Sequence, residues 1–417
     1  MRKIIIFFII LTIIGTVSLV AINLRKDSPH TDDTSETAIT QPIDLSGLDS
    51  YQPANGSIAT AANASAGEEP AASQAFTIRM NFVGDIMLAG NDTATSSIDA
   101  MASSQPSTYF FKNVRDYFLN DDITIANCEN VFSDNDNLVK TDKGEAAAIE
   151  QYNNALAEYN SAVALAQQTG TTVNMEKPEY TFRAFWFRSK AATAKLLPEN
   201  GVDVVSIDNN HTYDFGTDGN MDTRAALDVA GVDWGKDGKI VYKEINGFTI
   251  AFVFGSMYSA GGEQAMLVDL EEADANSDYQ VVYFHGGEEK VHAYEDWKQA
   301  SCHNLVDHGA DLVIGSHPHV LQPMETYNGV NIVYSLGNFI FGGNNYPENR
   351  TLIYNQTLTI TQDAATGGFT VTNTDVTLIP CYVYTGESNN YQPAVIENET
   401  DKQLVIDFMQ GKRELPY

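Results

Sequence analysis

Short apolar runs alternate with amphipathic stretches along the chain from about residue 77 onward. The runs are rich in β-branched and aromatic residues, and each ends in Gly, Asn, Asp or His, as in NFVGD, ITIANCEN, VVSIDNNH, VVYFHGG and LVIGSHPH. Between several of them lie helical patterns that close on a glycine, such as residues 223–231 and 294–309. Strands that alternate with helices predict an α/β fold. Residues 351–380 lack helix signals and predict two strands joined by a hairpin.

One Ala-rich stretch, residues 144–170, interrupts the series of strands like an insertion, which we place at about 140–175. Its apolar residues recur at three- and four-residue spacing and so form a single helical stripe. They are Ile149, Tyr152, Leu156, Tyr159 and Val163. The stripe favours an amphipathic helix packed on the folded body, and a lid over a site or a surface for a partner is the alternative.

The first 26 residues predict a membrane anchor. The apolar run at 4–22 would span about 28 Å as a helix, close to the ~30 Å core of a bilayer. No small-residue cleavage site follows it, which favours an uncleaved segment. Residues 27–75 are rich in Ser, Thr, Ala, Asp and Gly and predict a flexible polar linker. We therefore expect a single-pass protein of the cell membrane, with a folded extracytoplasmic domain at 76–385 and a C-terminal extension at 386–417.

Acidic residues dominate the charge of the chain. The 417 residues include 24 Lys and Arg against 55 Asp and Glu, which gives a formal net charge of −31. This balance disfavours nucleic acid and anionic lipid headgroups as partners, unless a metal or a local basic patch intervenes. The cysteines, Cys128, Cys302 and Cys381, fit neither a disulfide framework nor the spacing of a zinc knuckle, so we expect them to be small buried residues.

The polar residues at the ends of the apolar runs are the candidates for chemistry. Ligands of open α/β sheets bind outside the carboxyl ends of the strands, and five polar clusters are expected at that edge. They contain Asp85; Asn127, Glu129 and Asn130; Asp208, Asn209, Asn210, His211 and Asp214; His285, Glu288 and Glu289; and His317 with His319. Four of the eight histidines lie in these clusters, which indicates a shared site rather than scattered structural roles.

The His-Pro-His motif indicates a metal site. Pro318 biases His317 toward an extended conformation, and residues two apart in an extended chain point to the same side, so His317 and His319 are expected to face one site. Imidazoles beside carboxylates and an Asn carbonyl form a mixed nitrogen and oxygen ligand set, which suits Mn, Fe or Zn better than Ca or Mg. We expect two divalent ions that share a bridging carboxylate and activate a water.

At these motifs, between about residues 77 and 341, the chain resembles the bacterial poly-γ-glutamate capsule synthesis proteins of CapA type. The motifs are FVGDIML, NCEN, DNNHTYDFGTDG, FHGGEE, GADLVIGSHPHVLQPME and YSLGNFIF. The resemblance implies a calcineurin-like metallophosphoesterase fold, in which two mixed β-sheets pack face to face between helices as a four-layer α-β-β-α sandwich. It also implies an N-terminal transmembrane helix, in agreement with residues 4–22.

The same resemblance implies two groups of metal ligands. A first ion would be held by Asp85 and His319, with Glu129 as the bridging carboxylate. The ligands of a second ion would be Asn210, His285 and His317. Metallophosphoesterases at large have an Asp-x-His at the first strand, whereas Ile86 and Met87 follow Asp85 here, so one imidazole of that pattern is missing.

Further residues would serve the reaction and the substrate. The resemblance implies that His211 is a general acid or an oxyanion partner, oriented by Asp214. Asn338 and Glu289 would support the metal ligands through hydrogen bonds or contact the substrate. Arg183 is one of few positive charges, and it would bind an anionic phosphate or carboxylate; surface charge at a helix start is an equally supported alternative.

These features predict a membrane-anchored, metal-dependent hydrolase of metallophosphoesterase type that takes part in the synthesis of a capsule or another anionic surface polymer. Its substrate would be that polymer or a phosphoester, and capsule synthase subunits are expected partners. One alternative is a non-catalytic accessory subunit that binds the nascent polymer or the synthase. Another is a general surface phosphoesterase without a role in capsule production.

Overall fold

A computed structural model describes residues 74–415 apart from 92–96, 174, 183 and 346–348. The predicted anchor and polar linker therefore lie outside the described residues. Within the described ranges, none of the helices has the length and apolar character that crossing a bilayer requires. The folded region begins with β1 at Gln74, two residues before the predicted boundary.

A mixed sheet of eight strands contains the longest strands of the fold. Its order is β17-β16-β15-β1-β3-β6-β7, with β14 beside β1. β1, β3, β6 and β7 are parallel, whereas β15, β16 and β17 are antiparallel additions on the other side of β1. The strand bounds are β1 Gln74–Ile86, β3 Ile123–Cys128, β6 Val204–Ser206, β7 Asp233–Gly235, β14 Asn338–Ile340, β15 Arg350–Gln362, β16 Phe369–Tyr382 and β17 Ala394–Val395. β15 and β16 confirm the predicted hairpin.

A second sheet of six strands has the order β12-β13-β11-β10-β9-β8. Its four central strands are parallel, and antiparallel strands close both edges. The bounds are β8 Val241–Ile245, β9 Phe248–Met257, β10 Tyr279–Gly286, β11 Leu312–Ser316, β12 Leu321–Tyr327 and β13 Val330–Leu336. Every residue of β10 and β11 is buried, as expected for parallel strands that are covered on both faces.

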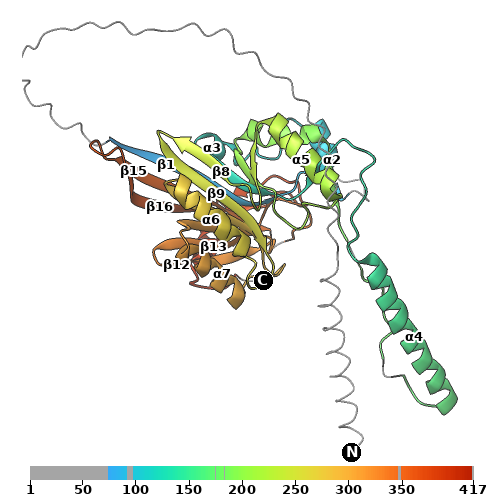
Figure 1. Cartoon of the computed structure of the whole chain (residues 1–417). Helices are drawn as coiled ribbons and strands as arrows, with labels where there is room; N and C mark the ends of the chain where they lie inside the picture. The colour runs from blue at the N-terminus through green and yellow to red at the C-terminus, as the bar shows by residue number, and fades with distance from the viewer. Residues whose placement is uncertain (1–73, 92–96, 174, 183, 346–348, 416–417) are drawn as a thin grey trace, which may run out of the picture. The chain divides into compact units, whose positions relative to one another are not determined.

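The two sheets pack face to face between layers of helices (Figure 1). The inner core joins residues of both sheets, such as Phe82 from β1 and Tyr283 from β10. A second apolar cluster lies between the eight-stranded sheet and α2, α3, α5 and η1, and a third lies between the six-stranded sheet and α6 and α7. These helices are α2 Ser97–Ser104, α3 Arg115–Leu119, η1 Ala191–Leu196, α5 Gly216–Ala230, α6 Gln264–Asn276 and α7 Asp296–Asp307. The predicted α/β class is confirmed, and the layers follow the helix–sheet–sheet–helix order that the resemblance implies.

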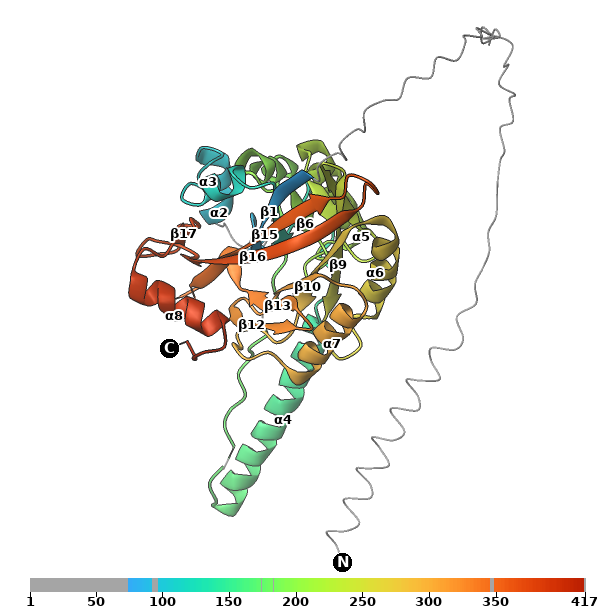
Figure 2. The ribbon, with the colours of Figure 1, turned by 90° about the vertical axis from the view of Figure 1, so that its left-hand side faces the viewer.

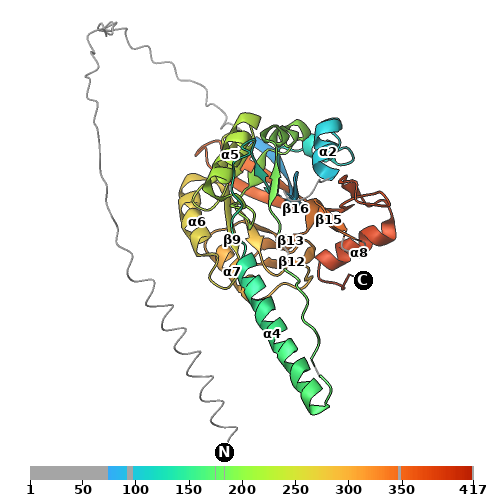
Figure 3. The ribbon, with the colours of Figure 1, turned by 90° about the vertical axis from the view of Figure 1, so that its right-hand side faces the viewer.

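The predicted insertion forms α4, Glu145–Thr169, between two left-handed glycines at 144 and 170. Only Ala166 of this helix is buried, so its apolar stripe is not part of the body's core, contrary to the packing that the stripe favoured. Tyr152 contacts Tyr180 of the returning segment, with ring centroids 5.6 Å apart. Figure 3 shows α4 outside the layers of the sheets and their covering helices.

The ends of the insertion, in contrast, are built into the body. β2 (Gly90–Asn91), β5 (Phe187–Ser189) and β4 (Val131–Phe132) form a small third sheet. β2 follows the strand that carries Asp85, and β4 follows Glu129 in the chain. β5 follows the insertion in the chain, so the same few residues close the insertion and border the candidate site.

The C-terminal extension, which the sequence pattern left unassigned, is part of the fold. It contributes β17 to the large sheet and ends in α8, Glu399–Met409, which lies beside β12 and β16 (Figure 2). The side chain of Asn398 caps the helix by accepting from the backbone N–H of Asp401. Asp401 in turn pairs with the buried Arg350 of β15 at 2.7 Å, which holds α8 on the sheet.

Candidate metal centre

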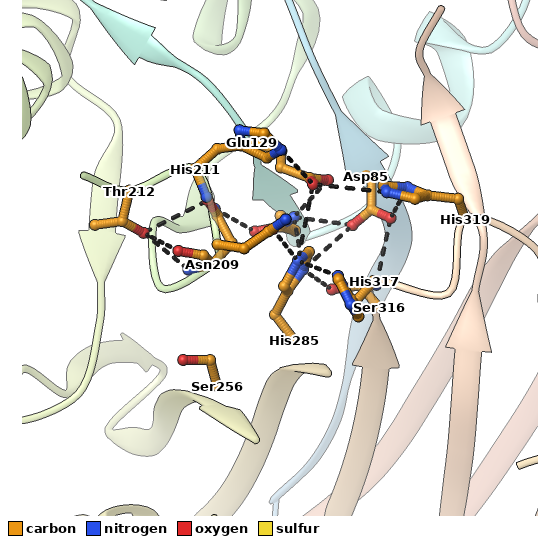
Figure 4. A network of polar contacts seen from close by, with 12 residues as sticks. Asp85, Glu129, Asn209, His211, Thr212, Ser256, His285, Ser316, His317 and His319 are labelled. Carbon is orange, nitrogen blue, oxygen red and sulfur yellow. Dashed lines mark hydrogen bonds and ion pairs between the residues drawn. The ribbon is translucent and has the colours of Figure 1, made fainter. Parts of the chain in front are cut away.

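The carboxyl ends of the parallel strands of both sheets meet at one place (Figure 4). Asp85 of β1 lies opposite Asn127 of β3 in the large sheet, and His285 of β10 lies opposite Ser316 of β11 in the small one. Side chains from the two sheets approach one another closely there: Asn127 Nδ2 is 3.1 Å from His285 Nδ1. This confirms the expectation that the polar clusters share one edge of the fold.

Glu129 is the centre of the cluster. Its carboxylate is fully buried, and its Oε1 atom has no hydrogen-bond partner among the described residues. The same oxygen lies 3.8 Å from His285 Nε2, 3.8 Å from His319 Nε2 and 3.9 Å from His211 Nε2. Burial, followed by the charges of Asp85 and Glu289, raises the pKa of Glu129. An orphaned buried oxygen among imidazole nitrogens fits a divalent cation, which would satisfy all of these groups.

Asp85 is also fully buried and is held by neighbours on several sides. Its Oδ1 accepts from Asn127 Nδ2 at 2.8 Å, and its Oδ2 lies 3.4 Å from the backbone nitrogen of His317 and from His319 Nδ1. Asp85, Glu129 and His285 each offer a ligand atom within 4.8 Å of the other two. The structure therefore places the two predicted carboxylate ligands side by side with one predicted imidazole.

His285 and His317 converge on a common point. His285 Nε2 lies 3.0 Å from His317 Nδ1 and 3.0 Å from the carboxamide oxygen of Asn210, which is the second ligand group that the resemblance implies. Burial lowers the pKa of His285 and lowers the pKa of His317 to about 3, and the neighbouring imidazoles add to both effects. The neutral imidazole is the form that binds metal, so both rings are suited to that role.

The backbone of the His-Pro-His loop differs from the prediction. His317 and His319 have φ angles of 97° and 57°, in the left-handed region, so the prediction of an extended chain at His317 was wrong. Both rings nevertheless face the site, with centroids 5.8 Å apart. Left-handed non-glycine residues carry a cost of order 1–3 kcal/mol each and are typical of functional sites, where surrounding structure enforces them.

Asn338 lies behind a ligand rather than on the substrate side. It is fully buried, and its Oδ1 accepts from His319 Nδ1 at 2.8 Å. This contact fixes the tautomer of His319 and leaves its Nε2, the nitrogen nearest Glu129, free for a metal. Asn338 is therefore a residue that orients His319.

His211 and Asp214 form the pair that was predicted. His211 Nδ1 lies 2.8 Å from Asp214 Oδ2, which also accepts from the backbone N–H of Phe187 at 2.8 Å. Burial lowers the pKa of His211, and the hydrogen bond to Asp214 opposes that effect. With Nδ1–H donated to Asp214, Nε2 points toward Glu129 as an acceptor.

Lys143 is a member of this pair that the sequence did not indicate. Its ammonium group lies 2.5 Å from Asp214 Oδ1 and 3.4 Å from His211 Nδ1. It also lines an open pocket of about 540 Å³ together with Asn209, Asn210 and Tyr213. Lys143 lies in the stem of the insertion, by which we mean the segments that lead into and out of the inserted residues on either side of α4. It is 68 residues from His211, so no local motif could have revealed it.

Tyr258, after β9, is a second residue that the sequence did not indicate. Its ring lies edge-on to His317, with centroids 5.2 Å apart, and it borders His285 at 6.4 Å. Gly286 permits the close approach of β9 and β10 there, because a Cβ atom would lie 1.6 Å from the carbonyl oxygen of Met257. Tyr258 is 47% exposed and thus forms a wall of the open side of the site.

Several other predicted residues have different positions. Arg183 lies outside the described residues, so its predicted role in anion binding stays a prediction. Asp208 accepts from Ser256 Oγ at 2.8 Å and from the backbone of Asp237, which makes it a structural link between the sheets. Asn209 donates to Asn127 and to the carbonyl of Cys128, and so holds the loop before His211. The three cysteines are free and buried, as expected.

Comparisons with known proteins agree with these motifs. Residues 152–343 match the family described as bacterial capsule synthesis protein PGA_cap. The chain is 26% identical to the capsule biosynthesis protein CapA of Bacillus anthracis over 364 residues, 80% of this chain and 74% of that protein. It is 33% identical to the PGA biosynthesis protein CapA of Bacillus subtilis (strain 168) over 171 residues, 36% of this chain and 45% of that protein. The resemblance to the CapA-type capsule synthesis proteins is confirmed.

Solved structures are more distant from this chain. The calcineurin-like phosphoesterase YfkN of Bacillus subtilis aligns with 82% of this chain and 100% of its own, at 13% sequence identity and a TM-score of 0.37. A phosphatase from Mycoplasma pneumoniae aligns with 74% of this chain and 95% of its own, at 12% identity and the same TM-score. At that TM-score the likeness does not establish a common fold.

Proposed function

We propose that this protein is a metal-dependent hydrolase of calcineurin-like type that acts in the synthesis of an anionic surface polymer such as poly-γ-glutamate. The observation that supports this most directly is the orphaned Oε1 of Glu129, which is buried among three imidazole nitrogens. The names of the CapA relatives support the link to capsule production. A membrane anchor at residues 4–22, which would hold the domain outside the cell, is part of the same proposal.

The ligands of the proposed centre come from both sheets. They are Asp85, Glu129, Asn210, His285, His317 and His319. Two ions of Mn, Fe or Zn held there would lower the pKa of a water to near 7 and neutralise the oxygens of a phosphoryl or acyl group. Burial of the carboxylates excludes solvent from the ligands, while the open pocket beside Asn210 and Tyr213 admits a substrate.

The chain's own groups would position the substrate and move protons. His211 Nε2 faces the centre as an acceptor and is held in place by Asp214, so it is suited to receive a proton and later to return it to a leaving group. Lys143 places a positive charge at the pocket wall, where it would attract a carboxylate or phosphate. The acidic chain as a whole repels such groups, so this local cation and the metal ions would provide the attraction.

Metal content is the first test of the proposed function. The purified protein should contain about two equivalents of Mn, Fe or Zn by mass spectrometry, and His317→Ala should lose most of that metal. His308→Gln is the matched control, because His308 is exposed after α7 and its Nδ1 lies 2.7 Å from the carbonyl oxygen of Asn304. The loaded protein should also hydrolyse a chromogenic phosphodiester.

Two results would redirect the proposal. If the protein binds no metal above background after reconstitution, the catalytic proposal fails and a non-catalytic subunit that binds the polymer or the synthase becomes the better explanation. If the protein binds metal but fails to hydrolyse phosphodiesters, peptides and glutamyl polymers, the metal has a structural or ligand-binding role.

A further inference from the structure

Glu289 lies with two of the histidines in a second group of potential ligand atoms. One carboxylate oxygen of Glu289 and one ring nitrogen each of His317 and His319 lie within 4.8 Å of one another. The other such group among the described residues consists of Asp85, Glu129 and His285. The cluster therefore divides into two adjacent sets of three donors, each with both carboxylate and imidazole.

The backbone holds Glu289 in this position. The turn after β10 contains Gly287 and Lys290 with φ angles of 107° and 63°, which reverse the chain over the site. The backbone N–H of Lys290 donates to the carbonyl of Pro318 at 2.8 Å. Since Pro318 lies between His317 and His319, this bond ties the loop that carries Glu289 directly to the loop that carries both imidazoles.

The two residues after Asp85 provide no donor at this position. Asp85 is followed by Ile86 and Met87, which are buried apolar residues without a nitrogen or oxygen ligand in their side chains. Asp85 Oδ2 and Glu129 Oε1 lie 3.4 Å and 3.8 Å from nitrogens of His319, whereas a carboxylate oxygen of Glu289 lies close to both His317 and His319. Glu289 is exposed at the mouth of the site, so its carboxylate reaches this position from the solvent side.

The charge around the site favours a cation at this point. Glu129 and Asp85 are buried close together, and the charge of Glu289 adds to the repulsion at Glu129. A divalent ion between Glu289 and the two imidazoles would replace this repulsion with attraction.

We propose that Glu289 is a direct metal ligand, which completes the site of one ion with His317 and His319. This inference rests on the proposed metal centre, to which it adds Glu289 as a ligand. Two imidazoles and one carboxylate suit Mn, Fe or Zn and leave coordination positions open on the solvent side.

Glu289→Gln and Glu288→Gln in the full chain provide a matched comparison. Both residues are exposed, adjacent and of equal charge, and only Glu289 belongs to the ligand group. Each protein is stripped with a chelator, reloaded with Mn, and measured by mass spectrometry, calorimetry and electron paramagnetic resonance, none of which depends on turnover.

We expect about two Mn ions in the wild type and in Glu288→Gln, and about one tightly bound ion in Glu289→Gln. Binding of the second ion should weaken by at least about 100-fold, more than the 10–100-fold cost of removing a residue that only supports a ligand. The signal of spin-coupled Mn pairs should be lost in Glu289→Gln alone. Glu289→His, which supplies a nitrogen donor in place of the carboxylate oxygen, should recover binding of two Zn ions.

The possible failures can be told apart. If Glu289→Gln binds as many ions as the wild type with unchanged affinity, Glu289 is not a ligand and this inference is overturned while the metal centre stands. If the wild type binds no ions, both the metal centre and the role of Glu289 fail. Equal losses in Glu288→Gln and Glu289→Gln would also overturn the inference, because they would indicate a general effect of surface charge.

Discussion

Individual residues of the candidate metal centre lower the stability of the metal-free protein. Glu129 is the clearest case, because a fully buried carboxylate with an orphaned oxygen is costly in a protein without metal. His317 and His319 add left-handed backbone conformations to that cost. Such conflicts are relieved when a ligand binds, which is why they concentrate at functional sites.

We therefore predict that Glu129→Gln stabilises the metal-free protein and prevents its loading. Removing the buried charge beside Asp85 should raise the free energy of unfolding in chelator by about 1–2 kcal/mol. Metal affinity should fall by at least about 100-fold, because the substitution removes a charged ligand. Urea unfolding with and without chelator, together with metal analysis, measures both effects. A variant that is less stable than wild type in chelator would contradict the view that this carboxylate is strained.

A second prediction concerns Asp121, at the opposite end of β3 from the site. Burial raises the pKa of Asp121 to about 7, and the charge of Asp203 adds to this, although Thr124 and Asn81 donate hydrogen bonds to its carboxylate. A carboxyl whose pKa is higher in the folded than in the unfolded protein takes up a proton on folding. Its contribution to stability is therefore lost as pH rises from about 4 to about 7.

Asp121→Asn should remove this pH dependence. The amide keeps an oxygen that can accept from Thr124 and Asn81, and it carries no charge at any pH. We expect the variant to be more stable than wild type by about 1 kcal/mol at pH 8, since solvent screens a half-buried carboxyl, and equally stable near pH 4. Thermal unfolding across this range measures the difference. If the stabilities of the two proteins change with pH in parallel, the prediction of a raised pKa for Asp121 is wrong.

At the scale of elements, the insertion consists of a helix that buries almost none of its residues and a stem that is hydrogen-bonded to the folded body. α4 buries a single residue, whereas Lys143 and Trp186 on either side of it close the stem. Trp186 Nε1 donates to the carbonyl of Thr141 at 2.9 Å, and the backbone N–H of Thr141 donates to the carbonyl of Asp214. The stem therefore holds the His211–Asp214 pair without any contribution from the helix.

We predict that residues 146–181 can be replaced by a short Gly-Ser linker without loss of the folded body. The melting temperature should change by less than about 3 °C, because little apolar surface of the body is uncovered. Metal content should be unchanged. Calorimetry and metal analysis test this, and replacement that extends to Lys143 serves as the comparison, which should impair turnover. A loss of metal on removing the helix alone would show that α4 is a lid that the site requires.

The elements also show which parts of the fold a sequence can reveal. The helices ending at Gly231 and Gly309 were predictable, because their periodicity and stop signals are local. The meeting of the five clusters was predictable from strand direction alone. The left-handed backbone at His317 was not, since it is enforced by contacts such as that between Pro318 and Lys290, which are distant in sequence. α8 was missed because its docking depends on Arg350, in a strand 51 residues away.

At the scale of the whole molecule, the acidic chain repels an anionic substrate, whereas the proposed function requires the candidate site to bind one. A chain with a net charge of −31 repels polyanions over most of its surface. In the proposed function, cations held at the candidate site would reverse this repulsion locally. Binding of an anionic polymer should therefore be confined to the site. A polymer bound only there would contact the protein through one of the polymer's ends or a single exposed linkage, and it would not adsorb along the polymer's whole length.

The path of β1 sets where any preceding segment can attach. Gln74 begins this strand and Asp85 lies near its end, so about 11 residues of extended chain separate them, or roughly 36 Å. Gln74 pairs with Gln362 at the tip of the long β15–β16 hairpin, while Asp85 pairs with Asn338 at the site. A pull on the chain from before Gln74 is therefore applied far from the candidate ligands. Whatever holds the protein there, the mouth of the site is left at the distant end, open to molecules that arrive from the other direction.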